Sequence, residues 1–125
     1  MSGATLPNAG QAVVAADKIA YLFNPLHPAN QGKAAFFVRF GFSLQHWPTL
    51  QTTLRDHPRA NLVVRVTSQP FGLKYRVDCS IQSPDGRNPC ITSIWMIDHG
   101  ATVPRFVTAY PNTRRAPPSW PRSSP

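Results

Sequence analysis

Residues 73–81 read LKYRVDCSI. Apolar and polar side chains alternate along this stretch, which is the period of two that a half-buried β-strand shows. The alternation predicts one face that meets a core and one that carries charge. The expected core-facing set is Tyr75, Val77, Cys79 and Ile81, and the charged set is Lys74, Arg76 and Asp78.

Three further segments have strand character, and turn signals separate them. They are rich in β-branched and aromatic residues, and the sequences PFG (70–72) and SPDGRNP (83–89) predict turns on either side of 73–81. Short turns of this kind join antiparallel neighbours. The four expected strands are 61–67 (NLVVRVT), 73–81, 90–98 (CITSIWMID) and 104–110 (PRFVTAY).

The chain before residue 61 has the period of a helix instead. Ile19, Leu22 and Phe23 fall on one helical face, and Leu44, Trp47, Leu50 and Leu54 form a second stripe. The expected helices run from Asp17 to about Phe23, from about Gln31 to Phe40, and from Ser43 to Asp56 or His57, before Pro58. Helices followed by hairpin-linked strands predict an α+β domain, with two or three helices packed on a four-stranded, mainly antiparallel sheet.

The length of 125 residues fits one domain. We expect residues 1–110 to form it. Residues 111–125 hold five prolines and three arginines and read as a basic, disordered tail. The first ten residues lack the charged and apolar regions of a secretory signal, and no apolar run could span a bilayer, so the expected location is cytoplasmic.

The charge balance points to a polyanionic partner. Lys and Arg number 13 against 5 Asp and no Glu, which gives a net charge of +8. Such a surface attracts nucleic acid or an acidic protein. Arginine, which supplies ten of the cations, suits bidentate contacts to phosphate. A GC-rich genome would also raise the arginine content, although it would not remove every Glu.

No metal or other cofactor is expected. Cys79 and Cys90 are too few and too far apart for a zinc motif, and a disulfide is not expected in a cytosolic chain. The four histidines are scattered, and His57 and His99 read as loop residues.

Seven polar residues of the strand segments could meet across neighbouring strands. Cations that hold phosphate, together with hydroxyls that move protons, are what RNA cleavage through the 2′-OH requires. The alternative is an ordinary solvated sheet face. The seven residues are Lys74, Tyr75, Arg76, Thr92, Arg105, Thr108 and Tyr110.

His27 and Lys33 form a second candidate pair. His27 lies in a proline-flanked loop and could act as a general acid or base near neutral pH. Lys33 lies in the first turn of the second helix, where a cation opposes the helix dipole. The alternative for His27 is a loop histidine without a partner.

The sequence resembles a bacterial family of small toxin-like domains of unknown function, over residues 6 to 111. The motifs that carry the resemblance are Leu6-Pro7-Asn8-Ala9, Asn24-Pro25-Leu26-His27-Pro28, Lys33-Ala34-Ala35-Phe36-Phe37, Gly41-Phe42, Trp47, Pro70 to Asp78, Pro84-Asp85-Gly86-Arg87, Thr92-Ser93-Ile94-Trp95 and Pro104 to Pro111.

The resemblance implies a distant similarity to the ribonuclease toxins that include barnase, colicin D and RelE-like enzymes. It implies a metal-independent endoribonuclease acting on tRNA or mRNA, with a small acidic antitoxin or immunity protein as partner. RNA would contact Lys33, Arg76 and Thr92, with Lys74 and Arg105 also holding phosphate. His27 or Tyr110 would move protons, while Thr108 and Tyr75 orient the scissile phosphate. The alternatives are a non-catalytic nucleic-acid-binding module and a protein-interaction subunit.

Overall fold

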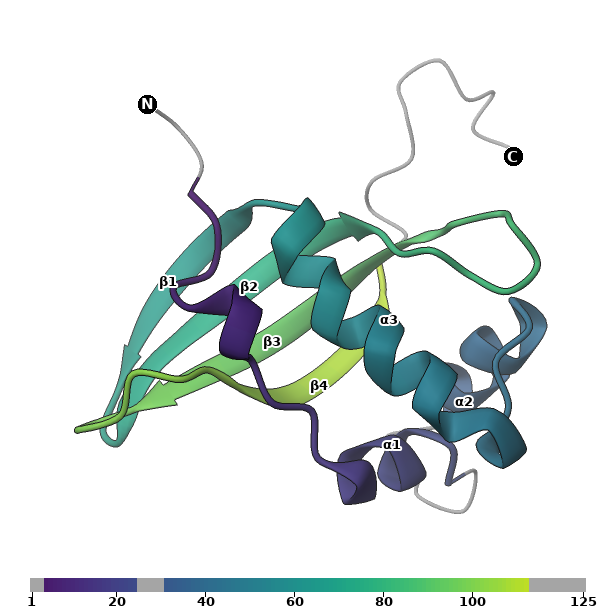
Figure 1. The fold of residues 1–125 in the computed structure, drawn as a ribbon, viewed down its shortest axis with the longest axis horizontal. Coiled ribbons are helices and arrows are strands. Elements are labelled where there is room, and N and C mark those ends of the chain that lie inside the picture. The colour runs from purple at the N-terminus through teal and green to yellow at the C-terminus, as the bar shows by residue number, and fades with distance from the viewer. Residues whose placement is uncertain (1–3, 25–30, 113–125) are drawn as a thin grey trace.

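A computed structural model describes residues 4–24 and 31–112, in which three α-helices precede four β-strands (Figure 1). The helices are α1 (Ala16–Leu22), α2 (Gln31–Arg39) and α3 (Trp47–Ala60). The strands are β1 (Val63–Gln69), β2 (Gly72–Ser80), β3 (Cys90–Asp98) and β4 (Arg105–Pro111). The expected α+β class is confirmed. None of the described helices is long and apolar enough to cross a membrane.

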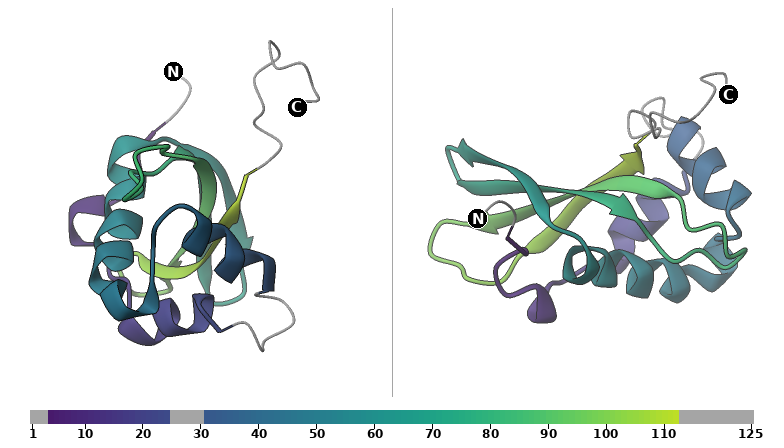
Figure 2. Two further views of the ribbon diagram at one scale, coloured as in Figure 1. Left: turned by 90° about the vertical axis from the view of Figure 1, so that its right-hand side faces the viewer. Right: turned by 90° about the horizontal axis from the view of Figure 1, so that it is seen from above.

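The sheet is a simple antiparallel meander in the order β1-β2-β3-β4. Hairpin turns join its neighbours, as the turn signals predict. Figure 1 and the views of Figure 2 show that the helices cover one face of the twisted sheet, with α3 running across it. The β1–β2 and β3–β4 turns extend beyond the helices (Figure 2, right).

The core lies between the helices and this face of the sheet. Leu50 and Leu54 of α3 are fully buried, and so is Trp95 of β3. The rings of Trp95 and Phe106, from neighbouring strands, meet edge to face with centroids 5.4 Å apart. These contacts place the odd-numbered residues of β3 under the helices and turn the even-numbered ones to the opposite face.

Helix α3 continues past Pro58 to Ala60, so the expectation that it ends before Pro58 is wrong. Proline removes the hydrogen bond to the carbonyl of Leu54, four residues earlier, and its ring crowds that carbonyl, so tertiary contacts at this end of the helix offset the cost. The side chain of Asn61 links the C-terminal end of α3 to β2, because its Nδ2 donates to the carbonyls of His57 and Ser80, each at 3.0 Å.

His57 is a buried core residue of α3 rather than the expected loop residue, and it is only 2% exposed. Its Nε2 lies 2.7 Å from the carbonyl oxygen of Cys79, so this nitrogen carries the proton and donates. Its Nδ1 then accepts from the Ser93 hydroxyl at 2.7 Å, and Ser93 accepts from the indole of Trp95 at 2.8 Å. The chain of bonds is complete only with a neutral imidazole.

We expect the folding stability to fall as the pH drops below about 6.5. Burial lowers the pKa of His57 in the native state, although the Cys79 carbonyl and Asp78 oppose the shift. The unfolded chain therefore binds a proton that the native protein does not, which costs up to about 1.4 kcal/mol per pH unit. Chemical denaturation between pH 8 and 5 measures this slope. His57→Gln should flatten it, whereas His99→Gln, at an exposed position, should leave it unchanged; equal slopes in all three proteins would contradict the prediction.

Candidate functional site

The face of the sheet opposite the helices carries most of the polar residues that the sequence singled out. We call it the polar face. Strand register defines its cross-strand rows, because directly paired residues share a face. The rows are Thr67, Lys74, Met96 and Arg105; Arg65, Arg76, Ile94 and Thr108; and Asp78, Thr92 and Tyr110.

Helix α2 contributes a cation to this face. The Nζ of Lys33 donates to Oγ1 of Thr108 at 3.0 Å, across 75 positions of sequence. Thr108 stands next to Ile94, and Tyr110 lies two residues further along the same side of β4, about 7 Å away. Burial lowers the pKa of Lys33 from its ordinary value. The arrangement joins an ammonium, a hydroxyl and a phenol.

Beside this pair, a buried network ties β2, β3 and the end of β4 together. Oδ1 of Asp78 accepts from Nε of Arg76 at 3.0 Å and from the hydroxyl of Thr92 at 2.8 Å. Asn112 donates from Nδ2 to Oγ1 of Thr92 at 3.1 Å. Asp78, Thr92 and Asn112 are 8%, 0% and 8% exposed. These buried residues therefore fix the position of the Arg76 guanidinium through its bond to Asp78.

The network keeps both of its charges ionised. Burial would raise the pKa of Asp78, but hydrogen bonds from Arg76 and Thr92 outweigh it and hold that pKa below the ordinary value. The hydrogen bond to Asp78 raises the pKa of Arg76 in turn, and the neighbourhood of Tyr110 acts in the same direction. Arg76 is only partly buried, so its guanidinium can present further N–H groups to an anion.

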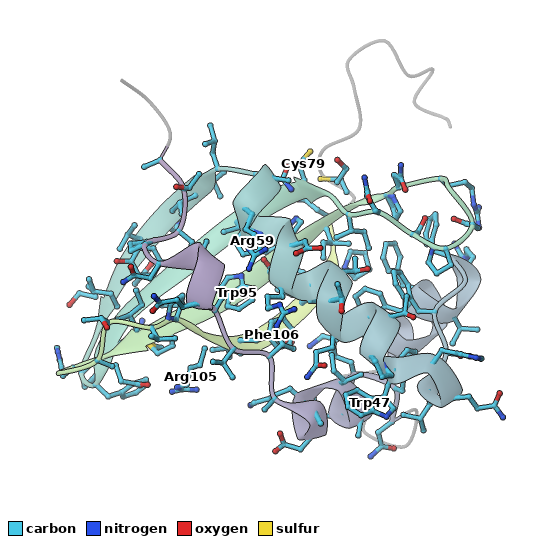
Figure 3. All side chains as sticks on the ribbon, in the orientation of Figure 1. Trp47, Arg59, Cys79, Trp95, Arg105 and Phe106 are labelled. Atoms are coloured by element: carbon cyan, nitrogen blue, oxygen red, sulfur yellow. The ribbon has the colours of Figure 1, made fainter. Side chains whose placement is uncertain are left out.

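Arg105 lies at the other end of the polar face. Figure 3 shows it far from Cys79, the labelled residue near the end of β2. Its guanidinium forms a two-bond ion pair with Asp98, with Nε and Nη2 at 2.8 and 3.1 Å from the carboxylate oxygens. The pair is largely exposed, and its hydrogen bonds lower the pKa of Asp98 and raise that of Arg105.

The structure brings most of the sequence-predicted residues to the polar face, but it places Tyr75 on the opposite face and buries Thr92. Tyr75 lies on the helix-covered face, where it is 9% exposed and belongs to the core, because side chains alternate along β2. Thr92 is on the polar face but is fully buried, which removes its hydroxyl from contact with a ligand. Lys74 is half-buried on the polar face. His27 lies outside the described residues.

Two members of the network were not among the candidate site residues. The alternation in 73–81 puts Asp78 on the charged face, and its position two residues after Arg76 indicates that the two share a side of one strand. Asn112 gave no signal, because it lies in a segment that composition assigns to the tail. In the structure β4 extends to Pro111, and the backbone N–H of Asn112 donates to the carbonyl of Cys90 at 3.2 Å.

Within residues 4–24 and 31–112, no three His, Cys, Asp or Glu side chains gather in a group that could hold a metal ion. The side chains on the polar face offer ammonium, guanidinium, hydroxyl and phenol groups.

Fold and site define a class: a small basic α+β protein with helices on one sheet face and a cationic, hydroxyl-bearing cluster on the other. Within that class, the chain belongs to the family described as Domain of unknown function (DUF6883), whose model matches residues 5–113. The expected membership of a domain-of-unknown-function family is confirmed at this level. The distant similarity to barnase and its relatives stays a prediction.

A similar fold occurs in a solved structure. It is described as a contact-dependent growth inhibition toxin–immunity protein complex from Klebsiella pneumoniae 342, and one of its chains matches with a TM-score of 0.64 and 20% identity. The alignment covers 80% of this chain and 99% of that chain. At this identity the likeness shows the fold alone. No curated protein matches the sequence significantly.

Proposed function

We propose that the protein is a toxin-like, metal-independent endoribonuclease that binds RNA across its polar face. The observation that carries the proposal is the hydrogen bond between Lys33 and Thr108, beside Tyr110 and Arg76. The bond joins α2 to β4, and Arg76 of β2 stands in the same cross-strand row as Thr108, so the groups that phosphodiester cleavage needs lie on one part of the polar face.

The reaction would proceed through the 2′-OH of the substrate. A base takes the 2′ proton while the 2′ oxygen bonds to phosphorus, and the bond from phosphorus to the 5′ oxygen breaks as that oxygen receives a proton. The products are a cyclic phosphate and a 5′-hydroxyl. The negative charge that develops on the phosphoryl oxygens requires fixed donors.

Each group of the cluster has a natural part in these steps. Arg76, braced by Asp78, and Lys33 would hold the phosphoryl oxygens, while Thr108 orients the Lys33 ammonium. Because burial lowers its pKa, Lys33 also releases a proton more readily than an exposed lysine. Tyr110, or His27 from the segment before α2, would complete the proton transfers. Lys74 and Arg105 would contact more distant phosphates.

Two further observations support the proposal. The net charge of +8 favours a polyanionic substrate. The fold is shared with a chain from a complex of a growth inhibition toxin and its immunity protein. On this proposal the second partner is a small acidic antitoxin or immunity protein.

The same likeness favours one other function. Because that complex contains both a toxin and an immunity protein, the shared fold also suits a non-catalytic interaction subunit. Such a subunit would bind an acidic protein and leave RNA intact.

An RNA cleavage assay in excess EDTA tests the proposal. We expect the wild-type protein to cut tRNA or total RNA into discrete fragments with cyclic phosphate ends. Lys74→Ala and Arg105→Ala should weaken RNA binding and its salt dependence more than they slow the bound reaction, because they lie away from the Lys33–Thr108 pair. Intact RNA at high protein concentration, with a salt-sensitive gel shift, would instead identify a binding module; intact RNA without a shift would favour the interaction subunit.

A further inference from the structure

Exposed apolar side chains concentrate around the β1–β2 hairpin, from the residue before β1 to the second residue of β2. Of the nine large apolar side chains that are exposed in the described residues, five lie between residues 62 and 73. We call these five the β1 patch: Leu62, Val64, Val66, Phe71 and Leu73, which are 39–53% exposed. The β1–β2 turn extends past the helices (Figure 2, right), which leaves Phe71 and Leu73 uncovered, and β1 lies at the edge of the sheet. A grouped apolar surface of this kind marks an interaction site more often than scattered residues do.

The backbone of β1 is also open on one side. β1 is an edge strand that pairs only with β2. At its first residue, the N–H of Val63 donates to the carbonyl of Ala4 at 2.8 Å in an isolated antiparallel bridge. No other described segment pairs with the outer edge of β1. The edge of β1 therefore already pairs with one backbone segment at Val63. Among the described residues, no segment pairs with its backbone groups after Val63.

Few of the usual defences against edge pairing are present. Proteins shield edge strands with Lys, Pro, bulges or covering elements. β1 contains no Lys and no Pro; it has one bulge near its start, between Val63 and Arg65, and a single charge at Arg65. The valines on either side of Arg65 are both about half exposed.

We propose that β1 is the docking site for a β-strand of a different, acidic protein, which adds to the sheet edge. Strand addition takes its affinity from backbone hydrogen bonds and its specificity from alternate side chains. Val66 pairs with Tyr75 and so faces the helix side, whereas Arg65 pairs with Arg76 on the polar face. A matching strand therefore alternates apolar side chains beside Val66 with carboxylates beside Arg65.

A second copy of this chain fits the same edge poorly. Two β1 strands paired antiparallel about their central Val66 would set each Arg65 opposite Thr67 of the other copy and diagonal to the other Arg65. Arg76 and the other copy's Lys74 would stand in the same row, and like charges gathered on one face of a strand pair destabilise it. Each copy also carries a net charge of +8. Charge complementarity selects an acidic partner instead.

The docked strand would also reach the proposed ribonuclease site. Arg65 and Arg76 stand in the same row as Ile94 and Thr108. Carboxylates beside Arg65 would extend the polar face with negative charge and compete with RNA phosphates. This consequence rests on the proposed function; the docking itself does not.

A ten-residue peptide that alternates valine and glutamate is the probe, and no RNA is present. Fluorescence anisotropy measures its binding, and hydrogen exchange locates it. We expect salt-sensitive binding that protects amides of β1. Arg65→Glu should weaken the binding about tenfold or more, whereas Arg55→Glu, the same charge change at an exposed position of α3, should have a small effect.

Three results would overturn the docking proposal: no binding at millimolar peptide, protection located away from β1, or equal binding by wild type and Arg65→Glu. Equal binding of a peptide with lysine in place of glutamate would overturn the acidic character of the partner. A protein that cleaves RNA but fails this test would lose only the docking proposal. A protein that binds the peptide but leaves RNA intact would lose only the ribonuclease proposal.

Discussion

Lys33→Met is expected to lower RNA cleavage about 1,000-fold while the protein stays folded. Methionine keeps most of the apolar stem and removes the ammonium that bonds Thr108. If Lys33 stabilises the phosphoryl charge or supplies a proton, its loss costs a factor of about 10² to 10⁴. Single-turnover cleavage of tRNA measures the effect. The midpoint of thermal unfolding should move little, because one half-exposed hydrogen bond is lost.

Two controls separate the chemistry from general electrostatics. Lys18→Met removes the same charge from α1, away from the polar face, and should change the rate by less than about threefold. Thr108→Val keeps the Lys33 charge but removes its hydrogen-bond acceptor. If Thr108 orients Lys33, the double variant should be little slower than Lys33→Met alone. A Lys33→Met protein that cleaves as fast as Lys18→Met would remove Lys33 from the site.

Local periodicity was sufficient to predict the architecture. The alternation in 73–81 indicated which side chains share a face, and the structure places Tyr75 with the core and Lys74 with the polar face as that pattern requires. Placing Tyr75 with Lys74 in one site conflicts with this alternation, because neighbouring residues of β2 face opposite sides of the sheet. The helix end at Pro58 was missed because the tertiary contacts of Asn61 and the burial of His57 outweigh the local preference of proline.

The contacts that make the candidate site could not be read from spacing. Lys33 and Thr108 are 75 residues apart, and they meet because α2 packs near β4. In β4 the register shifts opposite Ile94 and Trp95, which lets Phe106 and Ala109 both face the core although they are three residues apart. A strict period of two would put Thr108 under the helices together with Phe106. The bulge turns it toward Lys33 instead.

The second large effect concerns stability. Asp78→Ala is expected to lower the free energy of unfolding by about 3 kcal/mol, because it leaves Arg76 without its carboxylate and Thr92 without its acceptor in a buried place. For a domain of this size, that corresponds to a fall of about 10–20 °C in the unfolding midpoint. The native pKa of Asp78 lies below the unfolded value of 3.8, so its contribution is present above about pH 4 and is lost as the pH falls further.

Asp98→Ala is the matched control, because Asp98 also bonds an arginine on the polar face but does so in solvent. Exposed ion pairs contribute little to stability, so this variant should unfold close to the wild-type midpoint and show the same loss on acidification. Asp78→Ala should also slow RNA cleavage, since Arg76 is no longer held beside Tyr110 and the Lys33–Thr108 pair. If the two variants are equally stable at neutral pH, the bonds of Asp78 to Arg76 and Thr92 do not stabilise the fold, and the prediction is wrong.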